Sequence, residues 1–435
     1  MAKLWKVLIA LALFAPIAWR LSLSAPPKDT SRKTVMRYMA WGYPSQLGTE
    51  RKLVEAFEAQ PENADIDVEF IMAPMQSYYD KLQLMLVSGT GPDVVRVNPD
   101  HFFGYVKLGF AKDVEPYMQS DPQFNLDDFF LAARNASLYN GRHYGVGVLF
   151  TTTLVYYNKT IFQKAGVKDP WQRYQDNEWD WNSFLDAAKK TTIDEESNRQ
   201  YGCDLSGSLN VASFMVPSWG GRLLSPDRKT CLVNSPQAVD ALQWVVDVVW
   251  KWRAAPTPAQ SAMSIFTFES GKMAMMLDSS GESPRLRDAI SKFEWDVAPT
   301  PVGPTGIAAS YGAHLLIMNS ATKVPDVAWR YMRFMTSPVA EKILGCQLRR
   351  CIPTRRAIAL SEEYLRADGP PYNMRAFIAR VDNPQPETPY DDRWPEWSSL
   401  WQNYIDAAFL STKPVQQAMD EAVVEIDKVL AGETD

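Results

Sequence analysis

The stretch from Val35 to Met72, VMRYMAWGYPSQLGTERKLVEAFEAQPENADIDVEFIM, sets the fold class. Its first six residues are mostly apolar and predict a strand, and Gly42 and Pro44 then turn the chain. Between Thr49 and Gln60 the apolar residues recur on one face of a helix, and Val68–Met72 predicts a second strand. A strand, a turn, an amphipathic helix and a strand in this order indicate an α/β fold.

The same alternation continues towards the C-terminus. A helix that Gly89 ends is followed by the apolar strand Val94–Val97. The Pro-rich stretch Asn383–Pro395 predicts a loop. Proline is favoured at the start of a helix, so we expect three further helices to begin at Pro236, Pro325 and Pro414.

Length and composition restrict the class of protein. The chain has 435 residues, and single hydrophobic cores stop growing at roughly 250–300 residues, so two lobes are expected. The formal net charge of −6, with no block of Lys and Arg, argues against non-specific binding to nucleic acid. The 15 Trp and 18 Tyr are expected mostly in the core, but they also suit a pocket for flat, hydroxyl-rich ligands.

The N-terminus has the pattern of an export signal. Lys3 and Lys6 precede the apolar run Val7–Trp19, which ends near the small residues Ser22 and Ser24. The run is shorter than the roughly 20 residues that span a bilayer as a helix. We therefore predict a signal peptide or an uncleaved N-terminal anchor over residues 1–24 and a linker over 25–33. Either form places the protein in the periplasm, and the second tethers it to the inner membrane.

The presence of four cysteines is consistent with an exported protein. Cys203 and Cys231 are 28 positions apart, and Cys346 and Cys351 are five apart. In an oxidising compartment an even number of cysteines permits two disulfides, although four cysteines allow three pairings and buried free thiols are the alternative. We predict disulfide bonds and leave their connectivity open.

Eight pieces of the chain, taken in order, resemble one known family. They resemble the extracellular solute-binding proteins of bacterial ABC importers (family 1), the large group that includes maltose- and oligosaccharide-binding proteins. The match covers roughly residues 34–357, and the tail from about 358 to 413 matches only loosely. The pieces are GTGPDVVRVN from Gly89, GFAKDVEPYM from Gly109, YNGRHYGVGVLFTTTLVYYNKTIFQKAG from Tyr139, WDWNSFLDAAKKTT from Trp179, WGGRLLSPDRKTCLVNSPQAVDALQW from Trp219, FESGKMAMMLDSSG from Phe268, FEWDVAPTPVGPTG from Phe293 and AWRYMRFMTSPVAEKIL from Ala328.

The resemblance implies a type II periplasmic-binding-protein fold, with two α/β lobes hinged by crossover strands. By position, the crossovers are expected near residues 150–153, 278–280 and 318–320. This assigns residues 34–150 and 280–318 to lobe 1, and residues 151–279 and 319–435 to lobe 2. Such a protein is expected to be a monomer that closes around its ligand and delivers it to the permease subunits of an ABC transporter in the inner membrane.

A sugar presents an apolar ring face and many hydroxyls, so its site needs aromatic plates and hydrogen-bonding side chains. Trp41 and Tyr43 follow the first strand, at the edge where open α/β sheets bind ligands, and Asn98 follows the third strand at the same edge. Trp219 precedes the glycine pair that the family carries near the cleft. Asp278 stands at a predicted crossover, where many relatives have a tryptophan shortly after the strand.

Three further candidates come from the C-terminal part of the chain. Tyr311 resembles a family strand that passes the cleft, and Arg355 lies in a segment that resembles a loop near it. Trp397, four residues before Trp401, is expected in the core by default, although it could replace the missing stacking partner. For each candidate, a packing role is the alternative to ligand contact.

Other functional classes find little support. The chain has no G-x-S-x-G elbow, no G-x-x-x-x-G-K phosphate loop and no H-E-x-x-H metal motif, so no catalytic residue, cofactor or metal is expected. A secreted carbohydrate-processing enzyme is a remote alternative. A sugar or oligosaccharide is the expected ligand, and a sugar phosphate, a polyol or a polyamine is the alternative. A receptor-docking sensor would have the same fold as a transport protein.

Overall fold

A computed structural model of the chain describes residues 33–42, 47–205, 209–306, 308, 311–383 and 390–433. The predicted N-terminal segment 1–24, nearly all of the linker and Tyr43 lie outside these residues. Among the helices of the described ranges, none is both long enough and apolar enough to cross a bilayer.

The strands form one long mixed sheet with the order β2-β1-β3-β10-β6-β8-β7, and β9 also pairs with β6. β1 runs parallel to β2 and β3, whereas β10 is antiparallel to β3 and β6. The strands are β1 (Thr34–Trp41), β2 (Ile66–Ala73), β3 (Val94–Val97), β6 (Val146–Asn158), β7 (Tyr201–Asp204), β8 (Met273–Ser279), β9 (Trp295–Pro299) and β10 (Tyr311–Met318), and a separate ribbon contains β4 (Leu138–Tyr139) and β5 (Arg142–His143).

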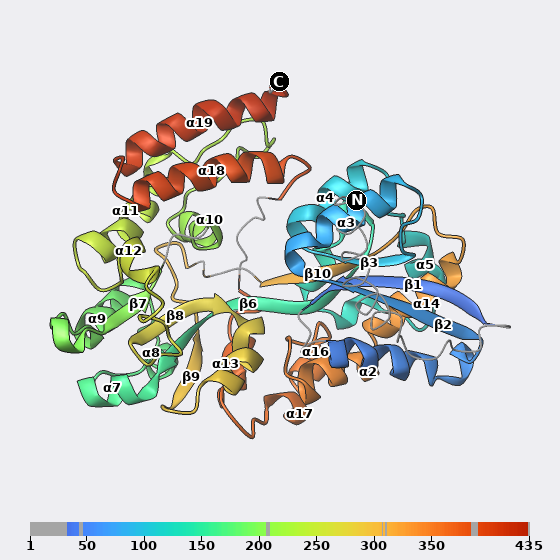
Figure 1. Ribbon diagram of the computed structural model, residues 1–435, viewed down its shortest axis with the longest axis horizontal. Helices are drawn as coiled ribbons and strands as arrows, with labels where there is room; N and C mark the ends of the chain where they lie inside the picture. The colour runs from blue at the N-terminus through green and yellow to red at the C-terminus, as the bar shows by residue number, and fades with distance from the viewer. Residues whose placement is uncertain are drawn as a thin grey trace, which may run out of the picture.

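The molecule has two lobes, and the long strand β6 runs through both of them (Figure 1). Its first half, up to Thr152, pairs with β10. Its second half, from Thr153, pairs with β8 and β9. The first lobe therefore contains β1, β2, β3 and β10, and the second lobe contains β7, β8 and β9. The chain crosses between the lobes at Thr152–Thr153, within the predicted first crossover.

Amphipathic helices cover both faces of the first half of the sheet. Leu53, Val54 and Phe57 of α2 are buried, as their spacing predicts. One apolar cluster joins the residues of α2 to β1 and α14, and a second joins α3 and α4 to the opposite face. The helices of this lobe are α2 (Leu47–Glu58), α3 (Met75–Val87), α4 (Pro99–Lys107), α5 (Glu115–Ser120), α14 (Pro325–Met335) and α15 (Pro338–Glu341).

The second lobe has the largest apolar cluster, which draws on residues from β6, β8, α9, α10, α11, α18 and α19. α18 and α19 pack against each other at the end of this lobe (Figure 1). Its helices are α7 (Lys159–Ala165), α8 (Pro170–Gln175), α9 (Trp181–Thr191), α10 (Leu209–Ser218), α11 (Pro236–Trp250), α12 (Pro258–Ser261), α13 (Ser283–Ala289), α18 (Trp394–Phe409) and α19 (Val415–Ala431).

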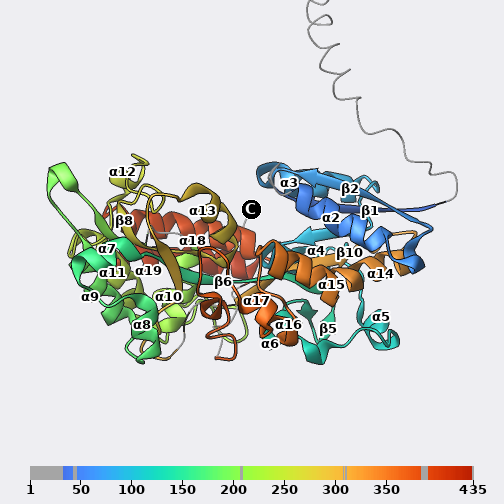
Figure 2. The same ribbon diagram turned by 90° about the horizontal axis from the view of Figure 1, so that it is seen from below.

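A further cluster lies where the lobes join. It combines residues of both halves of β6 with Tyr311 and with apolar residues of the segment 346–377. α16 (Arg356–Ala359) and α17 (Glu362–Leu365) belong to this segment and lie near the junction, beside β6 (Figures 1 and 2). α6 (Leu131–Asn135) contributes Ala133 to the same cluster.

The predicted lobe boundaries are wrong at two places. Residues 280–299 belong to the second lobe, because β9 pairs with Leu154–Asn158 of β6. The chain passes from β9 to β10 of the first lobe only after Pro299, so there is no crossover at 278–280. The predicted crossover at 318–320 is also absent, because α14 stays in the first lobe and packs Tyr331 against Tyr38, with ring centroids 5.0 Å apart.

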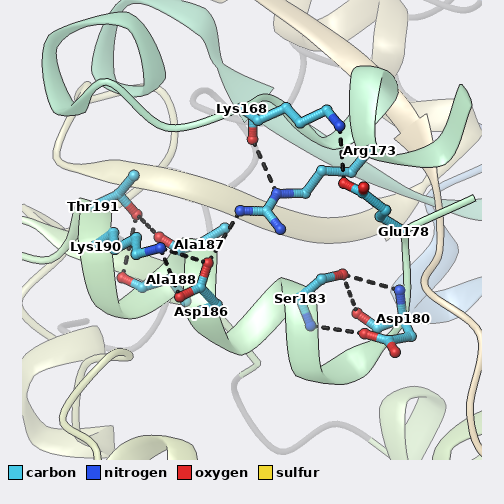
Figure 3. A network of polar contacts seen from close by, with 10 residues as sticks. All are labelled: Lys168, Arg173, Glu178, Asp180, Ser183, Asp186, Ala187, Ala188, Lys190 and Thr191. Atoms are coloured by element: carbon cyan, nitrogen blue, oxygen red, sulfur yellow. Dashed lines mark hydrogen bonds and ion pairs between the residues drawn. The ribbon is translucent and has the colours of Figure 1, made fainter. Parts of the chain in front are cut away.

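α9 shows how local sequence starts an element of this fold. Asp180 accepts a hydrogen bond from Ser183 N (2.8 Å), and Ser183 Oγ accepts one from Asp180 N (3.0 Å), which forms a capping box. Arg173 of α8 donates to Asp186 of α9 (3.1 Å) and to the carbonyl of Lys168 (3.2 Å). Figure 3 shows these contacts, which join α8 to the second turn of α9.

The disulfide prediction is not supported by the structure. All four cysteines are free and buried. Cys203 and Cys231 lie in the core of the second lobe, and Cys203 directs its thiol towards the carbonyl of Ala254. Cys346 belongs to the junction cluster and Cys351 to the cluster of the first lobe.

Candidate ligand-binding site

The backbone segments of the two lobes meet around the middle of β6. Thr152 N–H donates to Ser280 Oγ (3.2 Å), and Tyr156 Oη donates to the carbonyl of Ser279 (2.7 Å). Gly281 lies close to Arg350, because a Cβ at this glycine would be 3.9 Å from the Arg350 carbonyl oxygen. These contacts hold the backbone at the junction of the two lobes, and ligand sites in two-lobed proteins are expected at such a junction.

Trp41, at the end of β1, stands in an aromatic cluster on the first lobe. Its ring centroid is 5.2 Å from those of Tyr78 and His314 and 6.2 Å from that of Tyr79. The guanidinium of Arg96 lies 4.5 Å from the centre of the Trp41 ring. Tyr78 and His314 are buried or enclosed by these contacts, whereas Trp41 keeps part of its surface exposed. Trp41 is thus held by its neighbours and is only partly buried.

A buried ion triad fixes the position of Trp41. Arg96 donates to Glu50 (2.5 Å) and to the carbonyl of Trp41, and Arg350 donates to the same Glu50 oxygen (2.7 Å). Burial alone would raise the pKa of Glu50, but Arg96 and Arg350 outweigh it and hold that pKa below its usual range. Glu50 therefore stays ionised and keeps both arginines in place.

His314 is neutral in this environment. Burial, with a contribution from Arg96 and Arg350, lowers its pKa to about 3. Its Nδ1 atom has no hydrogen-bond partner among the described residues. A neutral imidazole beside Trp41 adds ring contact without adding a charge.

Polar groups gather at the start of α4, next to the aromatic cluster. Asn98 N–H donates to Tyr79 Oη (2.9 Å), and His101 stacks on the Tyr79 ring with centroids 3.6 Å apart. Oδ1 of Asn98 and Oδ1 of Asp100 are buried without a hydrogen-bond partner among the described residues. Burial raises the pKa of Asp100 and lowers that of His101, and each group opposes the shift of the other. Unpaired acceptors of this kind are costly unless a ligand satisfies them.

Sequence reasoning missed Tyr79, Asp100 and His101 as site residues. One signal was available, because Asp100 and His101 directly follow Asn98 at the carboxyl end of β3. The stacking of His101 on Tyr79 joins α4 to α3, and the sequence gives no direct sign of such a contact.

The second lobe contributes carboxylates. Asp278 lies at the end of β8 and Asp204 at the end of the parallel strand β7. Burial raises the pKa of Asp278 to about 6, and Glu282 and Asp204 add to this rise, while the hydrogen bond from Ser279 N (2.7 Å) and Arg285 oppose it. Asp278 therefore keeps its proton to a higher pH than a solvated carboxyl group does.

Trp219 is partly exposed and belongs to a tryptophan cluster of the second lobe. Its ring centroid is 5.7 Å from that of Trp244 and 6.1 Å from that of Trp181. The next residue, Gly220, has φ +87°, and Gly221 packs tightly, because a Cβ there would lie 2.8 Å from Val216 Cγ1. The glycine pair therefore serves the backbone, and Trp219 packs against the apolar core of the second lobe.

Three predicted ligand contacts are corrected by the structure. Tyr311 is buried in the junction cluster, and its Oη accepts a hydrogen bond from Arg380 N (3.3 Å). Arg355 is buried, donates to Asp128 (2.7 Å) and to the Thr336 carbonyl (2.6 Å), and lies over the Phe129 ring. Trp397 is fully buried and donates to Asp391 (3.2 Å). Packing and internal hydrogen bonds thus occupy all three side chains.

The side chains of the candidate site offer groups that can bind a ligand. In the described parts of the chain, no three His, Cys, Asp or Glu side chains lie close enough together to hold a metal ion. The described groups are aromatic faces, amide and carboxylate oxygens and fixed arginines. Such groups can hold a ligand that has apolar faces and hydroxyls.

Comparison with known proteins decides the family. The model of the family described as bacterial extracellular solute-binding proteins matches residues 43–342. The chain belongs to this family. The match of this solute-binding protein begins shortly after β1 and reaches α15, so it includes strands of both lobes.

Its relatives cover most of its length. A Brucella abortus protein named only as a binding protein is 25% identical over 384 residues, which are 86% of this chain and 88% of the relative. The maltotriose-binding protein of Pyrococcus abyssi is 22% identical over 311 residues, 70% of this chain and 63% of the relative. The solved ABC substrate-binding protein of Listeria monocytogenes in complex with cycloalternan has a TM-score of 0.81 and 24% identity, over 92% of this chain and 99% of that one. This likeness establishes the two-lobed fold of the solute-binding protein.

Proposed function

We propose that this solute-binding protein captures a sugar or oligosaccharide between its lobes and delivers it to the permease of an ABC importer. The observation that carries the proposal is the partly exposed face of Trp41 beside the unpaired oxygens of Asn98 and Asp100. A pyranose ring can stack on Trp41, and its hydroxyls can donate hydrogen bonds to the side-chain oxygens of Asn98 and Asp100. The names of the relatives support this ligand class, since two of them refer to saccharides.

We propose a periplasmic location, with a cleaved signal peptide or a tethered N-terminus. Support comes from the extracellular character of the family and from the basic and apolar pattern of residues 3–19. Delivery to a permease follows from membership in a family of ABC binding proteins. A sensor that docks on a receptor would use the same lobes, and the ligand test below does not depend on this choice.

A thermal-shift screen tests the ligand class. The full-length protein is heated with mono- and oligosaccharides, polyols, sugar phosphates and polyamines. A saccharide at 100 times its dissociation constant should stabilise the protein by about 2.7 kcal/mol and raise its melting temperature. Trp41→Ala should remove the shift, because it removes the stacking surface. The control is Trp250→Ala, a change at a partly exposed tryptophan on α11 of the second lobe.

Each outcome of the screen has a defined meaning. A shift with saccharides that Trp41→Ala abolishes and Trp250→Ala leaves intact supports the proposal. A shift only with polyamines or sugar phosphates contradicts the ligand class. If a saccharide is consumed, as followed by chromatography, the protein acts as an enzyme and the binding proposal fails.

A further inference from the structure

An ion pair joins the two lobes on the side of α18. Lys107, the last residue of α4 in the first lobe, pairs with Asp392, which lies just before α18 of the second lobe. The two residues are 285 positions apart. The hydrogen bond and the charge of Asp392 raise the pKa of Lys107, and the pKa of Asp392 is lowered although burial opposes this. Both groups are therefore charged at neutral pH.

The segment that carries Asp392 is fixed to the second lobe on both sides of this residue. Arg228 donates to the carbonyl of Tyr390 (2.6 Å), and Trp397 donates to the carboxylate of Asp391 (3.2 Å). Arg393 donates to the carbonyls of Val429 and Leu430 at the end of α19. Asp392 thus moves with α18 and α19, and the start of α18 is seen near α4 in Figure 1.

A second contact of the same segment reaches the candidate site. Tyr390 lies edge-on to Trp394, with ring centroids 4.9 Å apart. Burial raises the pKa of Tyr390 to about 12, and the carboxylate of Asp100 contributes to this rise. Asp100 is also on α4, where one of its oxygens is unpaired. The start of α18 therefore lies beside α4, where Asp392 pairs with Lys107.

We propose that the Lys107–Asp392 ion pair is a latch that stabilises the closed arrangement of the two lobes. The segment Tyr390–Trp394 carries the latch and closes one side of the candidate site. The proposal rests on the proposed function only for the identity of the ligand, because closure itself is a property of the two lobes.

The exposure of the pair sets the strength of the latch. Lys107 keeps 59% of its side-chain surface exposed and Asp392 keeps 23%. Ion pairs that water reaches contribute little, so breaking this one should lower the ratio of closed to open protein by about two- to fivefold. A weak latch suits a binding protein, because a strong one would close the lobes without ligand and oppose release.

Distance measurements between spin labels test the latch without any ligand. Labels on Lys81→Cys of α3 and Gln243→Cys of α11 report the separation of the lobes, and both positions are exposed whereas the native cysteines are buried. In the full-length, ligand-free protein, Lys107→Glu should shift the distance distribution away from the closed separation. The double variant Lys107→Glu with Asp392→Lys should restore it, because the pair is remade with opposite polarity.

A matched control separates the latch from a general effect of charge. Lys413→Glu also reverses a lysine in an ion pair, but its partner Glu421 lies in the same lobe, so the distribution should not change. An unchanged distribution in Lys107→Glu would overturn the proposal. A lengthened distribution that the double variant does not restore would overturn it as well. Both results are independent of the saccharide screen, so a failed latch and a failed ligand class remain distinguishable.

Discussion

A tryptophan that stacks on a ligand needs a rigid support, and the residues around Trp41 supply one. Arg96 lies over part of the ring and holds the Trp41 carbonyl, while Glu50 holds Arg96 and Arg350 together. Removing one member of such a buried group leaves an uncompensated charge, which costs several kcal/mol. The triad is thus best understood as a device that fixes the geometry of the site.

Asp278 should make the stability of the protein depend on pH. Its pKa is raised to about 6 in the folded protein, mainly by burial, against 3.8 as the usual value. The folded state therefore holds the proton more tightly, and the stability due to Asp278 is present below about pH 4 and is lost as the pH rises through about 6. The shift corresponds to at most about 3 kcal/mol, and we expect about 1–2 kcal/mol because the group is partly exposed.

Unfolding curves of Asp278→Asn and the wild type at pH 4 and pH 7 measure this effect. The variant should be more stable relative to the wild type at pH 7 than at pH 4. The exposed Asp288 of α13 provides a control, and Asp288→Asn should show no such difference. Equal behaviour of Asp278→Asn at both pH values would mean that Asp278 is well solvated in the folded protein.

Among the elements of the fold, α9 owes its start to two side chains. In Asp180→Ala the N–H of Ser183 loses its acceptor, and the stability should fall by about 1 kcal/mol, as measured by denaturant unfolding. Asp180→Asn keeps an acceptor of the same size and should cost only a few tenths of a kcal/mol. A loss as large in the Asn variant as in the Ala variant would show that the negative charge at the helix start is what matters.

The elements that the sequence predicts well are those whose signals are local. The apolar face of α2 and the proline starts of α11 and α14 follow from neighbouring residues, and the structure confirms them. The place of β9 could not be predicted in this way, because it depends on pairing with a part of β6 that lies far away in the sequence. This pairing is what moves residues 280–299 into the second lobe.

The candidate site shows the same difference between features with local sequence signals and features that depend on contacts between distant residues. Trp41 and Asn98 could be predicted to lie at the same edge of the sheet, because Trp41 ends β1 and Asn98 follows β3, and these two strands are parallel. Tyr390 could not be linked to Asp100, since tertiary packing alone brings the tail beside α4. Trp397 and Trp401 share a helical face, and this spacing indicates a core helix as readily as a ligand-facing one.

On the scale of the whole molecule, buried cysteines occur in both lobes. Two lie in the core of the second lobe, and the other two lie in the first-lobe and junction clusters. Burial raises the pKa of Cys231 and Cys351 to about 12 and that of Cys346 to about 11. A buried neutral thiol is a poor nucleophile, so the folded protein should react very slowly with a thiol reagent.

Thiol titration of the unreduced protein decides between free thiols and disulfides. In guanidinium chloride, without reductant, we expect all four thiols to react, because the structure leaves all four free. Reductant should then change neither the number of reactive thiols nor the unfolding midpoint. A count of two or none in unreduced, unfolded protein would mean that export oxidises the chain, and a reductant-sensitive midpoint would show that the bond contributes to stability. Free thiols in both lobes would instead mean that each lobe keeps its fold without a disulfide cross-link.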